Sequence, residues 1–144
     1  MIQINKTALV PYTNHEMFIL VNGIDDYPNF LPWCKSVLIH SKTENSVVAT
    51  IEMGGAGMRK SFTTDNVIIP DERIEIRLQK GPFSHLQGYW TFKPLGDDGC
   101  KISMQMEFKI SNPLLKFSLE PMFTKITNRL VDTFVERAEQ LYGN

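Results

Sequence analysis

Polar and apolar residues alternate along much of the chain. Near the start, Ile4, Ala8 and Val10 share one parity and most intervening positions are polar, which predicts a half-buried strand over residues 2–10. The alternation resumes over residues 36–111, where glycine, proline, asparagine and aspartate separate the apolar runs. Connections this short are typical of an antiparallel meander with one apolar face, and we expect about six strands in it.

Helical spacing occurs near both ends of the chain. Thr13 and Glu16 form a capping box ahead of a short apolar run, which predicts a helix that ends near Gly23. The proline-containing aromatic segment over residues 25–33 allows at most one or two helical turns.

A long helix is predicted at the C terminus. Asn112 and Pro113 suit the N-cap and the first helical position, and an apolar stripe follows at helical spacing. Pro121 has no backbone N–H and clashes with the carbonyl four residues earlier. We therefore expect a kink or break near residues 117–121, with the main helix starting about there.

This order of elements predicts an α+β fold in which a curved antiparallel sheet of about seven strands wraps around a long C-terminal helix. A chain of 144 residues is near the usual size of one domain, so we expect a single domain over residues 1–144. Apolar residues make up 42% and charged residues 22%, a mixture that argues against disorder.

Charge, hydrophobicity and cysteine content indicate which partners and which compartment to expect for the protein. The net charge is −1 and basic residues are scattered, which argues against a DNA partner. The apolar runs are too short to span a bilayer, and the first residues do not resemble a signal peptide. Cys34 and Cys100 lie far apart, so we expect reduced thiols in a cytoplasmic protein.

No catalytic motif stands out. His15, His40 and His85 each lie among ordinary polar residues, and neither cysteine has a recognisable histidine partner motif. No spacing typical of a metal site is present. Residues 54–61 come near a phosphate-binding loop, but the residue before the lysine is arginine and a strand follows. We expect a protein without enzymatic activity, metal or required cofactor.

Four segments carry a family resemblance: KTALVPY at 6–12, YPNFLPWC at 27–34, GMRKSFTTDN at 57–66 and GPFSHLQGYWTF at 81–92. Together they resemble the branch of the START-like (polyketide cyclase/dehydrase) superfamily that includes RatA-type ribosome association toxins and coenzyme Q-binding proteins. The resemblance implies the helix-grip architecture, with a deep cavity between the sheet and the terminal helix.

The resemblance implies two different roles. The first expectation is a hydrophobic-ligand-binding protein that holds ubiquinone or a related polyprenyl lipid, supports respiration and collects its ligand by peripheral membrane contact. The alternative is a RatA-type toxin that binds the large ribosomal subunit and inhibits 70S association, with Lys35, Arg59 and Lys60 as its contact residues. A polyketide cyclase-like enzyme is the third hypothesis.

The candidate cavity lining combines inward aromatic, methionine and small or polar residues. Gly88 shares the parity of its apolar neighbours, so it either leaves open space towards the helix or marks a close backbone approach. Thr64 and Asn66 are candidates for bonding a polar head group. The alternative to a ligand cavity is a well-packed core in which a few polar groups are hydrogen-bonded to one another or to the backbone. The candidate set is Phe30, Trp33, Phe62, Thr64, Asn66, Gly88, Trp90, Met104, Met106, Phe117 and Phe123.

Overall fold

A computed structural model describes residues 1–55 and 57–143. Seven antiparallel strands form one sheet in the order β1-β7-β6-β5-β4-β3-β2. The elements are β1 (Ile2–Val10), α1 (Asn14–Asn22), the 3-10 helix η1 (Ile24–Asn29), β2 (Cys34–Lys42), β3 (Ser46–Gly55), β4 (Met58–Ile69), β5 (Arg73–Lys80), β6 (His85–Leu95), β7 (Gly99–Lys109) and α2 (Pro113–Tyr142). The predicted α+β, helix-grip fold is confirmed.

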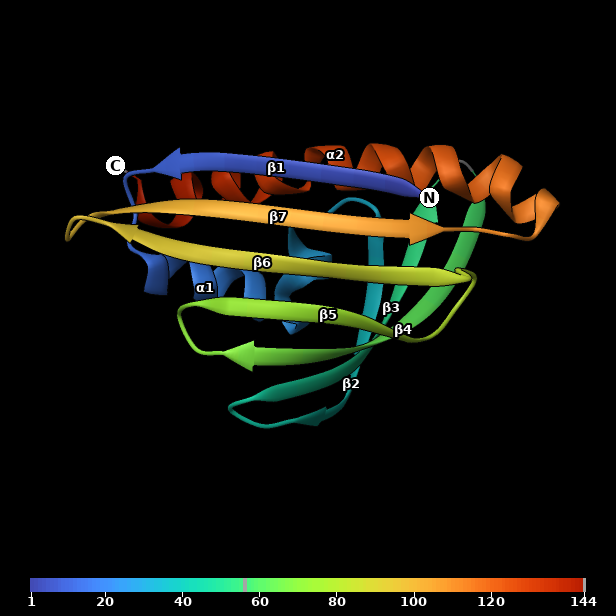
Figure 1. Ribbon diagram of the computed structural model, residues 1–144, viewed down its shortest axis with the longest axis horizontal. Coiled ribbons are helices and arrows are strands. Elements are labelled where there is room, and N and C mark those ends of the chain that lie inside the picture. Colours follow the sequence, from blue (N-terminus) through green and yellow to red (C-terminus); the bar gives the residue numbers. More distant parts are fainter. Residues whose placement is uncertain (56, 144) are drawn as a thin grey trace.

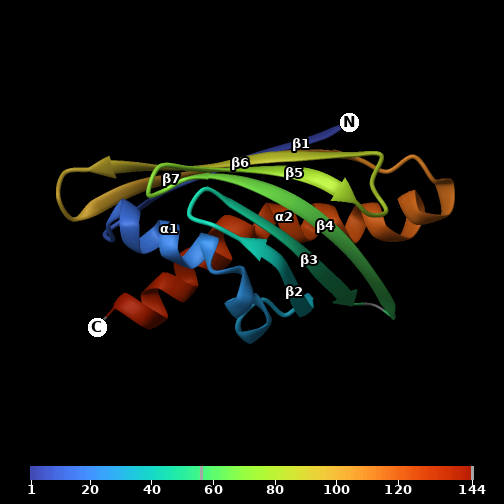
Figure 2. The same ribbon diagram turned by 90° about the horizontal axis from the view of Figure 1, so that it is seen from below.

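The sheet curves so that all the helices lie on one side of it. Figure 2 shows α2 running along the inner face, with α1 and η1 on the same side. The pairing register shifts within β2 and between Thr63 and Thr64 of β4, and such irregularities bend a strand and increase its twist. The first strand, β1, joins the sheet beside β7 and forms the edge opposite β2 (Figure 1).

The core occupies the space between the inner face of the sheet and α2. Burial alternates strictly along β7, where Cys100, Ile102 and Met104 are buried and the residues between them are not. Phe134 of α2 packs edge-on against Trp90 of β6 with ring centroids 5.4 Å apart. Contacts of this kind favour burial of a sheet face against a helix, because aromatic rings bring large apolar areas into contact.

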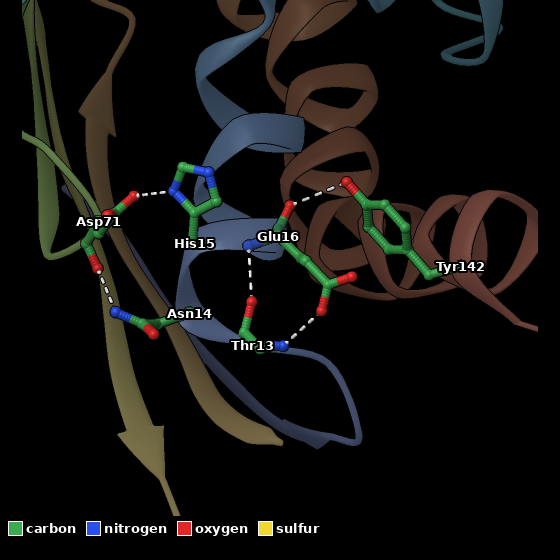
Figure 3. Close-up of polar contacts among 6 residues, drawn as sticks. All are labelled: Thr13, Asn14, His15, Glu16, Asp71 and Tyr142. Carbon is green, nitrogen blue, oxygen red and sulfur yellow. Dashed lines mark hydrogen bonds and ion pairs between the residues drawn. The ribbon is translucent and has the colours of Figure 1, made fainter. Parts of the chain in front are cut away.

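The short helix α1 begins as the sequence predicted. The Glu16 amide donates to the Thr13 hydroxyl at 3.1 Å, and the Thr13 amide donates to the Glu16 carboxylate at 2.9 Å (Figure 3). Asn14 donates to the Asp71 carbonyl at 3.0 Å, and the Tyr142 hydroxyl donates to the Glu16 carbonyl at 3.3 Å. These bonds tie α1 to the β4–β5 turn on one side and to the end of α2 on the other.

The long helix α2 has the predicted N-cap and first position, and it differs from the sequence prediction in the turns that follow. It begins at Pro113, where the Asn112 side chain accepts from the amides of Leu114 and Leu115, and it continues unbroken through Pro121. The expected break and later start near residues 117–121 are therefore wrong. Phe117, whose carbonyl loses its usual partner at Pro121, is 88% exposed, so water can satisfy that carbonyl. Figure 2 shows that α2 changes direction along its length without interruption.

Candidate functional site

A small internal cavity lies between the sheet and α2. Its volume is about 70 Å³, and its wall includes seven of the residues that the sequence singled out. They are Trp33, Phe62, Thr64, Asn66, Trp90, Met106 and Phe123. A water molecule takes up roughly 30 Å³ of liquid, and small-molecule sites usually span roughly 300–1,000 Å³. The cavity in this conformation therefore accommodates about two waters and is too small for a lipid.

Two polar side chains of β4 reach this cavity. Thr64 and Asn66 are buried, with 4% and 6% of their surfaces exposed. The Asn66 side-chain oxygen is buried without a hydrogen-bond partner among the described residues. A buried carbonyl oxygen without a partner costs free energy, so this position favours an additional donor in the cavity, from water or from a ligand.

Four of the predicted lining residues do not border the cavity. Phe117 is 88% exposed near the start of α2, so its assignment to the interior is wrong. This follows from the position of the first turns of α2, which extend beyond the sheet (Figure 1). Met104 is fully buried in the core away from the cavity. Phe30 packs edge-on against Phe134 at 5.5 Å between ring centroids, on the outer side of the aromatic cluster.

Gly88 is the fourth residue, and it leaves no open space. A Cβ atom placed on it would lie 2.7 Å from the Met106 sulfur and 3.0 Å from the Gln105 carbonyl oxygen. The Met106 side chain fills the space that the glycine leaves. The expectation of a cavity at Gly88 is wrong, and the alternative of a close approach describes this position.

Two side chains, the partly buried Tyr27 and the buried Cys34, are held in their neutral forms. Burial raises the pKa of Tyr27, which lies on the cavity wall, and its hydroxyl donates to the Val21 carbonyl. Burial also raises the pKa of the Cys34 thiol to about 11. A thiol needs its thiolate form to act as a nucleophile, so Cys34 is suited to packing at neutral pH.

The sequence analysis missed a larger depression on the outside of α2, which we call the outer groove. It has a volume of about 780 Å³ and lies between residues 30–35, the end of β3 and one face of α2. Trp33 and Ile126 border both the outer groove and the internal cavity, so they form part of the wall between them. The signal in the sequence was the spacing of Met122, Lys125, Ile126 and Arg129, which places these residues on one helical face.

The predicted basic residues divide between two faces of the sheet. Gly54 pairs with Arg59, and the Lys35 side chain lies across Gly54, so Lys35 and Arg59 share the outer face. Lys60 pairs with the fully buried Met53 and has the opposite parity. The three residues therefore do not form one patch. Arg59 also lies 3.5 Å from the Glu52 carboxylate, which partly neutralises it.

The three histidines occupy separate surface positions. His15 Nδ1 lies 2.6 Å from Asp71 Oδ1 (Figure 3), His40 Nε2 lies 2.7 Å from Thr50 Oγ1, and His85 Nε2 lies 3.0 Å from Glu107 Oε1. None of the three borders the cavity or the outer groove. Each pair is placed to stabilise the surface locally.

Residues 1–55 and 57–143 contain no cluster of three or more histidine, cysteine, aspartate or glutamate side chains that could hold a metal ion. Within the same ranges, no helix combines the length and the apolar character needed to cross a membrane.

The curved sheet, the long terminal helix and the space enclosed between them define a START-like, helix-grip protein. Residues 10–135 match the family described as "Polyketide cyclase / dehydrase and lipid transport". The chain is 41% identical to the ribosome association toxin RatA of Pseudomonas aeruginosa over 97% of each chain. It therefore belongs to this family, in the branch of the RatA-type proteins.

More distant relatives share the architecture. The mitochondrial coenzyme Q-binding protein of Drosophila melanogaster is 22% identical over 96% of this chain and 59% of its own length. The Zhui aromatase/cyclase from Streptomyces sp. R1128 superposes with a TM-score of 0.84, covering 96% of this chain and 94% of the other. At 15% identity, that likeness concerns the fold alone.

Proposed function

We propose that this protein associates with the ribosome, binds the large subunit and inhibits 70S formation. The observation that carries the proposal is the 41% identity to a ribosome association toxin over nearly the whole of both chains. The match extends over nearly the whole length of both chains at this identity, so it supports a shared partner more strongly than a shared fold does.

The basic residues of the outer face are the proposed contact. Lys35 is exposed and Arg59 is 69% exposed at its side chain, and both flank Gly54 at one end of the sheet. Ribosomal RNA presents phosphates, which arginine and lysine neutralise with release of counterions. The net charge of −1 limits this attraction to a local patch. We therefore expect binding that weakens with salt over a modest range.

The test is subunit association in a sucrose gradient. Added to dissociated subunits at low salt, the protein should lower the 70S peak, and the double variant Lys35→Glu/Arg59→Glu should lose most of this effect. The matched control is Lys93→Glu/Lys101→Glu, which reverses two exposed charges paired across β6 and β7. An unchanged 70S peak at protein excess would contradict the proposal, and equal loss in both variants would contradict the proposed contact.

Binding of an apolar ligand inside the cavity is the second candidate function. It is favoured by the buried Asn66 oxygen without a partner and by the family's association with lipid transport. Ubiquinone or a related lipid would need the cavity to expand, most simply by movement of Trp33 and Ile126, which separate it from the outer groove. The exposed Leu114 and Phe117 are the candidates for membrane contact in this scheme.

Short-chain ubiquinone tests this second function. In a Trp33→Phe variant, Trp90 is the remaining indole and borders the cavity, so an entering quinone should quench its emission with saturation. Asn66→Leu should weaken the quenching at least several-fold because it removes the acceptor and fills the space. The surface variant Asn128→Leu is the control, since this exposed residue lies on α2 away from the cavity wall. Linear, unsaturable quenching would exclude a site beside Trp90.

A further inference from the structure

The outer groove combines an apolar floor with a cationic rim. Its apolar part comes from the segment before β2, through Phe30, Pro32 and Trp33, and from Met122 and Ile126 of α2. Its volume of about 780 Å³ lies within the usual range of small-molecule sites. The groove is therefore more than ten times larger than the space inside the core.

Three cations surround this apolar floor from two elements. Lys125 and Arg129 are exposed residues one helical turn apart on α2, and Lys35 approaches from β2. Among the described residues, none of the three has a carboxylate within 4.0 Å. Glu136 is the acidic residue of the lining and lies nearly two helical turns beyond Arg129. The rim therefore attracts negative charge at the Lys125 end.

Lys35 is held at the rim by the backbone around it. Its amine donates to the Pro32 carbonyl at 3.2 Å, and its alkyl chain lies against Gly54. A Cβ atom on Gly54 would come within 2.8 Å of Lys35 Cγ and Cε. The absence of a side chain at Gly54 therefore allows the Lys35 side chain to lie against the backbone of β3. The cation is thus positioned beside the apolar floor before any ligand arrives.

From this arrangement we infer that the outer groove binds an anionic single-chain amphiphile, with its acyl chain on Trp33, Met122 and Ile126 and its carboxylate between Lys125, Arg129 and Lys35. The carbonyl oxygens of a quinone can accept hydrogen bonds from these cations but carry no net charge, whereas a carboxylate also forms ion pairs with them. The apolar chain would cover the exposed floor and remove it from water. This site is outside the internal cavity, and it shares Lys35 with the proposed ribosome contact.

Dodecanoate below its critical micelle concentration is the probe, measured by calorimetry on the whole protein. Binding should saturate at one molecule per chain and weaken as salt rises. The double variant Lys125→Glu/Arg129→Glu should lower the affinity at least tenfold and bind dodecyltrimethylammonium better than the parent does. Lys93→Glu/Lys101→Glu reverses the same number of exposed charges elsewhere and should leave the affinity unchanged.

Fluorescence places the bound amphiphile. In a Trp90→Phe variant the remaining Trp33 should shift its emission on addition of dodecanoate, and in Trp33→Phe the buried Trp90 should not respond. The inference is overturned by a response confined to Trp90, by an affinity that charge reversal leaves unchanged, or by absence of saturable binding in the calorimeter. The calorimetric comparison needs no tryptophan variant, so it decides the question even if one of them fails to fold.

Discussion

Gly88 shows how one residue sets the packing between two central strands. It pairs with Met106, whose sulfur would lie 2.7 Å from any added Cβ. The second obstruction is the Gln105 carbonyl oxygen at 3.0 Å, which belongs to the backbone of β7 and cannot turn away as a side chain can. Space at this position is therefore determined by the neighbouring strand.

We expect Gly88→Ala to lower the free energy of unfolding by about 1–3 kcal/mol, the usual cost of overpacking a core. The Met106 side chain would have to move into the small cavity that it borders, and β7 would have to shift slightly. Chemical denaturation followed by circular dichroism measures the change. Lys101→Ala on the outer face of β7 serves as the control and should stay within about 0.5 kcal/mol of the parent. A variant as stable as the parent would show that Met106 adapts freely.

At the scale of the element, α2 keeps its helical geometry across a residue that usually ends a helix. Pro121 lies on the exposed side of the helix and borders the outer groove. Downstream of it, Phe123, Val131 and Phe134 are buried against the sheet. This packing stabilises the helix more than one missing backbone hydrogen bond destabilises it, because most helical stability in proteins comes from the buried face.

Replacing Pro121 with alanine restores an amide donor to the Phe117 carbonyl. Proline in a helix interior is about 3 kcal/mol less favourable than alanine, and the more restricted unfolded chain offsets up to about 1 kcal/mol of this. We expect Pro121→Ala to raise the free energy of unfolding by about 1–2 kcal/mol in thermal or denaturant unfolding. Lys116→Ala, an exposed substitution one turn earlier, is the control. A loss of stability would mean that the proline ring makes contacts in the groove that alanine cannot replace.

At the scale of the whole molecule, the internal cavity and the outer groove share part of one wall. Trp33 and Ile126 border the internal cavity on one side and the outer groove on the other. The proposed ribosome contact lies at the same end, because Lys35 belongs both to the groove rim and to the outer basic residues. An occupied groove would therefore place a ligand beside the residues that we propose contact RNA.

The alternation of polar and apolar residues was sufficient to predict the elements. Residues 2–10 form β1 over the predicted range, the capping box of Thr13 and Glu16 begins α1, and the six-stranded meander follows in order. These features are local, since they depend on side-chain parity, turn residues and caps within a few positions. The family resemblance also followed from contiguous segments, and the comparisons confirm it.

Tertiary structure decided the parts that depend on distant neighbours. The sequence indicated open space at Gly88, and only the structure shows Met106 of β7 beside it. Phe117 was assigned inward because the sequence does not show that the first turns of α2 extend beyond the sheet. The outer groove lies between residues 30–35 and residues 118–136, and these two segments are more than eighty positions apart in the sequence. Periodicity determines which face of an element is buried, but whether two buried faces enclose space depends on side-chain volumes and on how the sheet bends around the helix.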